Sequence, residues 1–287
     1  MFKNEVAEFI YKRTYSRWIE EESRREDWPE TIERFIGFII SERPEIPEKT
    51  VHKIRKYMTE FAVMPSMRFL WAAGPAAKAD NTTIYNCSFA KINSVEAFAE
   101  CLYILMCGTG FGFSVEEEEV NKLPEIPKIK SGQALAKVLI DDSKKGWADS
   151  VKTLMNSLYD GQNVYFDYSA IRPEGARLMT MGGRASGPAP LIKLHDFIRE
   201  TMHNAQGRQL TTLECHDICN QIAEIVVVGG VRRSSQISLS DLQDEDMRHA
   251  KDWPFPIKRA MANNSAIYRE KPSAADFLKE WGSLALS

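Results

Sequence analysis

Cysteine is the residue type in this chain best suited to redox chemistry. The five cysteines form an odd set that contains no Cys-x-x-Cys pair: Cys87, Cys101, Cys107, Cys215 and Cys219. This pattern disfavours a disulfide scaffold and predicts reduced thiols in a reducing compartment. Most of them are expected to be inert core residues. Cys87, in Tyr-Asn-Cys-Ser at the end of a predicted strand, is by itself better explained as a small apolar strand residue than as a reactive thiol.

Cys215 and Cys219 lie one helical turn apart with His216 between them, a spacing that can hold a metal ion. The predicted helix is apolar and no second ligand pair follows, so we interpret these thiols as structural. The remaining histidines are scattered, and the sequence contains neither GxxxxGK[ST] nor HExxH. We therefore expect no metal site in this chain.

Two glycine-containing segments are candidates for binding. Residues 108–113 read GTGFGF, in which glycines allow a backbone to approach a ligand closely; a helix cap followed by a tight turn explains them equally well. Residues 229–235 read GGVRRSS and join a predicted helix to a predicted strand. Glycine, guanidinium and hydroxyl groups in one turn favour a phosphate or nucleotide contact, although such arginines can also be structural ion-pair donors. The glycine- and arginine-rich stretch 172–188 is a candidate for the same ligand.

The elements that would position these segments alternate between helices and strands. The first 63 residues are predicted to be helical, with helices over 30–41 and from Pro47 onward. Further helices are predicted to start after Ser94, around 147–158, over 190–205 and 213–228, and from Ser273. Strands are predicted over 68–71, 83–89, 111–115, 164–171, 231–239 and 266–268. The charge run Glu116–Glu119 is predicted to be a solvated loop or the start of a helix. This alternation predicts an α/β fold with mostly parallel strands.

Composition restricts the class of partner. The formal net charge of -3 and the pI near 6.0 give no basic footprint, so nucleic acid is not an expected partner. No apolar run reaches the roughly 18–20 residues needed to span a bilayer, and the N-terminus has no signal-peptide core. We expect a cytoplasmic protein without a membrane association. From the residues alone, the chain is an α/β protein with candidate nucleotide-binding loops.

At these same residues the sequence resembles the adenosylcobalamin-dependent (class II) ribonucleoside-triphosphate reductases. The similar runs follow the family's order and cover nearly the whole chain: FIYKRTYSRW, MPSMRFLWAAGP, YNCSFAKI, GTGFGFSVE, FDYSAIRPEGARLMTMGGRASGP, DICN, GGVRRSSQISL and ANNSAIY. The resemblance implies an N-terminal helical region, 1–63, followed by roughly the first half of a ten-stranded α/β reductase barrel, 64–287.

The resemblance also implies roles for particular residues. Cys87 corresponds to the first cysteine of the redox pair that reduces the ribose, and Asn86 and Gly110 correspond to positions that line the substrate site. The segment Gly229–Ser235 corresponds to the flexible loop that relays effector identity to base selection, and Ser94 with the 101–107 helix corresponds to part of the effector region. The effector residues implied are Ser94, Gly229, Gly230, Arg232, Arg233 and Ser234.

The reductase chemistry requires more than these residues. The family's finger loop, of Asn-x-Cys-x-Glu type, carries the radical cysteine and the carboxylate, and it has no counterpart in this sequence. We therefore expect a second polypeptide, the C-terminal half of the reductase, to hold that loop and most of the adenosylcobalamin site. The implied small partners are a ribonucleotide substrate, a deoxynucleotide effector and a thioredoxin-like reductant. The alternatives are a non-catalytic nucleotide-binding protein and, less favoured, another enzyme built on the half-barrel.

Overall fold

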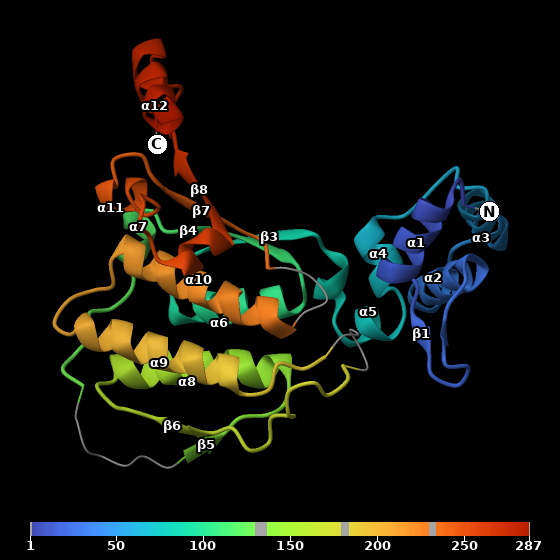
Figure 1. The fold of residues 1–287 in the computed structure, drawn as a ribbon, viewed down its shortest axis with the longest axis horizontal. Helices are drawn as coiled ribbons and strands as arrows, with labels where there is room; N and C mark the ends of the chain where they lie inside the picture. The colour runs from blue at the N-terminus through green and yellow to red at the C-terminus, as the bar shows by residue number, and fades with distance from the viewer. Residues whose placement is uncertain (1, 130–136, 179–183, 230–233, 287) are drawn as a thin grey trace. The chain divides into compact units, whose positions relative to one another are not determined.

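The computed structural model describes residues 2–129, 137–178, 184–229 and 234–286. For residues 227–229 and 286 it describes the backbone alone. The chain forms two compact units, Met1–Asn86 and Cys87–Ser287 (Figure 1). Each unit has its own hydrophobic core. No helix in the described part of the chain is long and apolar enough to cross a membrane.

The first unit is helical, as predicted. Its elements are α1 (Glu5–Thr14), β1 (Trp18–Ile19), β2 (Arg24–Arg25), α2 (Trp28–Glu42), α3 (Glu48–Thr59), α4 (Met67–Ala72), α5 (Pro75–Ala79) and the 3₁₀ helix η1 (Asn81–Ile84). Asp27 and Glu30 form a capping box at the start of α2, which satisfies backbone N–H groups that would otherwise lack partners. The core gathers around α2, where Trp28, Ile32 and Phe35 pack with Met58 and Leu70.

The predicted strand at residues 68–71 was wrong, because these residues form α4. The Ser66 hydroxyl accepts the backbone N–H of Phe69 at 3.1 Å, a helix cap that a short apolar run does not reveal. Arg34 of α2 donates to the carbonyls of Leu70 (3.1 Å) and Ala73 (2.7 Å). These contacts attach α4 to the helical unit, which extends to Asn86.

The second unit is built on a four-stranded parallel sheet. The strands are β3 (Cys87–Lys91), β4 (Gly110–Ser114), β7 (Gln236–Asp241) and β8 (Ala262–Ile267), in the order β3-β4-β7-β8. The short strands β5 (Lys137–Leu139) and β6 (Tyr165–Asp167) form a separate parallel pair. The α/β class and the mostly parallel pairing are therefore confirmed, whereas β5 was not predicted and β6 is shorter than expected.

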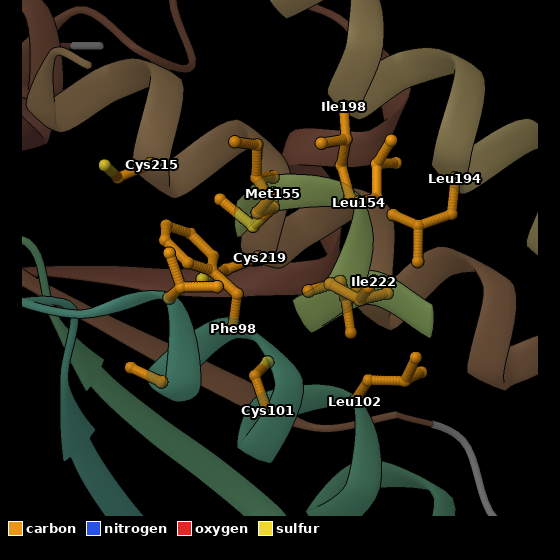
Figure 2. Close-up of a cluster of buried hydrophobic side chains, with 14 of the residues drawn as sticks. Phe98, Cys101, Leu102, Leu154, Met155, Leu194, Ile198, Cys215, Cys219 and Ile222 are labelled. Atoms are coloured by element: carbon orange, nitrogen blue, oxygen red, sulfur yellow. The ribbon is translucent and has the colours of Figure 1, made fainter. Parts of the chain in front are cut away.

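Helices cover one face of this sheet in two layers (Figure 1). The helices and the 3₁₀ helix η2 of the unit are α6 (Val95–Met106), α7 (Glu117–Val120), α8 (Lys144–Tyr159), α9 (Ala189–Asn204), α10 (Thr212–Gly229), α11 (Glu245–Arg248), η2 (Ile257–Met261) and α12 (Ala274–Leu286). Helices α6 and α10 contact the strands, while α8 and α9 pack on these two helices. Figure 2 shows the core between the layers, in which Phe98, Leu154 and Ile222 meet.

The opposite face of the sheet is more exposed. In register across the strands, Phe89 lies beside Gly112 and Gly112 lies beside Ile237. Phe89 and Ile237 are 54% and 41% exposed, whereas their neighbours Phe111 and Phe113 point into the helical layer and are buried. We call the side that carries Cys87, Phe89, Gly112 and Ile237 the open face.

One predicted surface feature is partly buried. Glu119, from the run predicted to be solvated, has a side chain only 5% exposed. Its carboxylate accepts Lys91 (2.6 Å), Lys122 (2.7 Å) and Asn93 (3.0 Å), and these bonds hold its pKa well below the ordinary value, to about 2. Charge runs are normally solvated, and here the fold places two lysines and an amide around one member of the run.

Candidate active site at the amino edge of the sheet

Cys87 is the first residue of β3, at the amino edge of the parallel sheet. It pairs in register with Gly110, the first residue of β4. The Ser88 hydroxyl donates to the Gly110 carbonyl at 2.9 Å, which ties the two strand starts together. Cys87 is exposed, whereas Cys101, Cys107, Cys215 and Cys219 are buried. The structure therefore presents one thiol of the five at the surface, next to a glycine backbone.

The same edge extends to β7. The backbone N–H of Phe111 donates to the Ser235 carbonyl at 2.9 Å, so the residues that precede β7 lie beside the start of β4. The predicted segment 108–113 and Ser235, the last residue of the predicted segment 229–235, thus lie together where Cys87 begins its strand. Asn86 directly precedes Cys87 and is exposed. The geometry brings Cys87, Gly110 and Ser235 to one edge, although these residues are far apart in the sequence.

The predicted effector residues do not all lie at this edge of the sheet. Gly229 is the last residue of α10, and Ser234 lies directly before Ser235 with a buried hydroxyl that makes no hydrogen bond among the described residues. Gly230, Arg232 and Arg233 lie outside the described residues. Ser94 precedes α6 and follows the carboxyl end of β3, so it lies at the opposite edge of the sheet from Cys87.

Sequence reasoning missed Gln236, a buried amide at the start of β7. Its Nε2 donates to the Cys219 carbonyl of α10 at 3.1 Å and contacts the Cys101 sulfur of α6 at 3.3 Å. This side chain therefore fixes β7 to both covering helices directly beside Ser235. Gln236 lies on the side of β7 that faces those helices, and only its place immediately after the predicted loop could have drawn attention to it.

Two of the buried thiols, Cys215 and Cys219, are poorly reactive. Burial raises the pKa of Cys215, and burial together with the neighbouring Cys101 raises the pKa of Cys219. A thiol with a raised pKa carries little thiolate at neutral pH and is a poor nucleophile. Among the described residues, no group of three or more His, Cys, Asp or Glu side chains is placed to hold a metal ion. Any thiol chemistry at this surface therefore centres on Cys87.

A cavity of about 810 Å³ lies at the carboxyl edge of the sheet, away from Cys87. Glu117, Glu118, Asp241 and Asp244 are among its lining residues. Arg269, also in the lining, contacts Glu116 (2.8 Å), Asp241 (3.4 Å) and Glu118 (3.5 Å). Because this arginine is already paired with carboxylates, the cavity does not suit a phosphate group.

Comparison with known proteins identifies two reductase segments in the chain. Residues 1–75 match the ribonucleotide reductase alpha domain, and residues 125–202 match the insertion domain of B12-dependent ribonucleotide reductase. The second match covers α8 and most of α9, the outer helical layer.

Curated relatives extend the similarity over most of the chain. The adenosylcobalamin-dependent ribonucleoside-triphosphate reductase of Lactobacillus gasseri is 28% identical over 93% of this chain and 46% of its own length. The corresponding protein of Levilactobacillus brevis is 28% identical over 92% of this chain and 45% of its own. The chain thus spans about half the length of the curated relatives it matches.

A solved structure gives the same result for the fold. A B12-dependent (class II) ribonucleotide reductase superposes with a TM-score of 0.78 at 25% identity, covering 90% of this chain and 45% of that one. The matched share agrees with that of the curated relatives. By these comparisons, the chain is similar to the N-terminal part of the adenosylcobalamin-dependent ribonucleotide reductases.

Proposed function

We propose that this chain supplies the N-terminal half of a ribonucleotide reductase that converts ribonucleoside triphosphates to deoxyribonucleotides, and that Cys87 is one thiol of its redox pair. The observation that carries the proposal is the exposed Cys87 paired in register with Gly110 at the amino edge of the sheet. Asn86 and Gly110 would line the substrate site, where the glycine backbone allows close approach. The residues after Gly229 would report on a deoxynucleotide effector, and Ser94 would belong to the effector region.

The chemistry explains why the chain needs a complement. Loss of the 2′-hydroxyl as water requires two electrons, which two thiols supply when they become a disulfide. Cys87 provides one of these thiols, and the other four cysteines are buried. We place the second thiol, the radical cysteine and the carboxylate that moves the proton on a second polypeptide, the C-terminal half that carries an Asn-x-Cys-x-Glu loop. A thioredoxin-like dithiol would then reduce the disulfide.

Adenosylcobalamin, when bound, supplies the radical chemistry of the curated relatives. The cavity at the carboxyl edge and the two buried histidines do not suit this cofactor. The cavity at the carboxyl edge is acidic, and both His195 and His216 are buried in the interior rather than displayed toward a ligand. We therefore place the cofactor mainly with the second polypeptide and assign it no contact here.

The test substitutes Cys87 by Ser in the complex of this chain with its second polypeptide. We expect deoxynucleotide formation to fall at least a thousandfold, because a hydroxyl cannot form the disulfide, while ribonucleotide affinity stays within threefold of the wild-type value. Product formation by radiolabelled nucleotide assay and affinity by equilibrium binding give the two readings. Substantial product formation by Cys87→Ser would show that Cys87 is not a thiol of the redox pair. Tight effector binding by the chain alone, with no catalytic complex, would favour the non-catalytic nucleotide-binding alternative.

A further inference from the structure

Helix α12 displays an apolar stripe along its length. Phe277, Leu278, Trp281 and Leu284 recur at spacings of one, three and four residues, which places them on one side of a helix. Their exposed fractions are 52%, 61%, 61% and 77%. In Figure 1 the helix extends away from the body of the second unit. We call these four residues the α12 stripe.

The rotation of α12 about its own axis is fixed by polar contacts. Glu280, whose side chain is only 18% exposed, accepts the Arg248 guanidinium of α11 at 3.0 Å. Arg248 also donates to the Leu242 carbonyl at 3.3 Å. At the start of the helix, the Ser273 hydroxyl accepts the backbone N–H of Asp276 at 3.1 Å. The helix is therefore capped and anchored through its charged side, and this anchoring leaves the stripe displayed.

A displayed stripe of this kind is unfavourable unless another surface covers it. Burying one large apolar side chain contributes about 1.5–3 kcal/mol, and contiguous apolar patches on proteins mark interaction sites. The chain spans only 45–46% of the length of its relatives, and the solved reductase likewise extends far beyond the part matched here. More than half of the family's polypeptide is thus available as the covering surface.

We propose that the α12 stripe is the docking surface for the polypeptide that supplies the remaining part of the reductase, which would cover it with a complementary apolar face. This inference rests on the proposed function and adds the location of the contact. Polar anchoring through Arg248 and Glu280 would hold the stripe in place before the partner binds, so little ordering of the helix would oppose association.

The test purifies the tagged full chain from its native host and identifies the bound polypeptide by mass. The affinity of that polypeptide is then measured by calorimetry for the wild-type chain, Trp281→Glu and Ser283→Glu. Ser283→Glu is the matched control, because it places the same charge on the opposite side of the same helix. Circular dichroism of each isolated chain shows whether α12 and the fold are retained.

We expect a reductase polypeptide with an Asn-x-Cys-x-Glu loop to bind the wild-type chain, Trp281→Glu to weaken binding at least tenfold, and Ser283→Glu to stay within threefold. Unchanged binding by Trp281→Glu overturns the docking surface and leaves the proposed function standing. Self-association of the wild-type chain that Trp281→Glu abolishes assigns the stripe to a second copy and also overturns it. If no reductase polypeptide binds the wild-type chain, the proposed function itself fails.

Discussion

Two imidazoles in the second unit are buried in their neutral form. The Ser150 hydroxyl donates to the Trp147 carbonyl at 2.7 Å, so its oxygen can accept the Nε2–H of His195 at 3.0 Å. The Tyr168 hydroxyl then donates to Nδ1 of His195 at 2.8 Å. These bonds need a single neutral tautomer of His195. A protonated ring would carry two N–H donors, and the contact with Tyr168 would lose its acceptor.

This arrangement predicts that the second unit loses stability as pH falls from about 7 toward 4. Burial lowers the pKa of His195 to about 3 and that of His216 to about 4, from an ordinary value of 6.5. The unfolded chain therefore binds protons that the folded chain excludes, which costs about 2 kcal/mol per imidazole at pH 5. Urea unfolding at pH 7.5 and pH 5, followed by amide exchange in α9 and α10, measures the loss.

His249 has a weak effect of the opposite sign on the pH dependence of stability. The Asp252 carboxylate raises its pKa, so its contribution is present at low pH and lost as pH rises, and its exposure keeps the effect small. An NMR titration that finds the His195 and His216 rings half-protonated near pH 6.5 would contradict the argument.

Some residues of the site were predictable and others were not. The thiol of Cys87 and the backbone of Gly110 lie in runs shared with a known family, and strand register then places them side by side. Gln236 was missed because its importance comes from contacts with Cys219 and Cys101. Those contacts depend on packing among α6, α10 and β7, which one-dimensional spacing does not specify.

Among the elements, β4 depends on a glycine at the centre of the sheet. A methyl group at Gly112 would approach Phe89 Cδ2 at 3.2 Å and Ile237 Cγ2 at 3.3 Å. These distances are shorter than ordinary carbon contacts, so a larger residue must displace the two apolar side chains of the open face. Gly112 therefore allows Phe89 and Ile237 to lie close together beside Cys87's strand.

We predict that Gly112→Val destabilises the second unit by about 1–3 kcal/mol, because the added atoms overpack the open face. Denaturant unfolding provides the measurement. The control is Gly282→Ala in α12, where nothing lies within 4 Å of the added carbon. In a helix this change should be neutral or stabilising by up to about 1 kcal/mol. Equal stability of Gly112→Val and the wild-type chain would show that the Phe89 and Ile237 side chains move aside without a cost in stability.

Element prediction succeeded where periodicity was long and failed where it was short. Helices α8, α9 and α10 follow apolar spacings over many residues and were confirmed. The run 68–71 was too short for its period to separate a strand from a helix, and the Ser66 cap decided the outcome. Strand β5 has three exposed residues and no alternating pattern to reveal it.

At the scale of the whole molecule, the chain forms two compact units and spans about half the length of the reductases to which it is similar. The parallel sheet displays Cys87 and the open face, and α12 displays its stripe. Both surfaces lie in the second unit. The missing finger loop, the second thiol and the cofactor site are all assigned to the part of the reductase that this chain does not span. The account therefore requires that activity appear only when the two parts are combined.

The most direct measurement is anaerobic deoxynucleotide formation with adenosylcobalamin and a dithiol, for this chain alone, for the second polypeptide alone and for the two together. We predict no product from either part and turnover of the mixture, with activity saturating at equal amounts of the two chains. Turnover by this chain alone would contradict the account, because Cys87 would then act without a finger loop. An inactive mixture of two folded, associated chains would contradict the assignment of this chain as the N-terminal half of a working reductase.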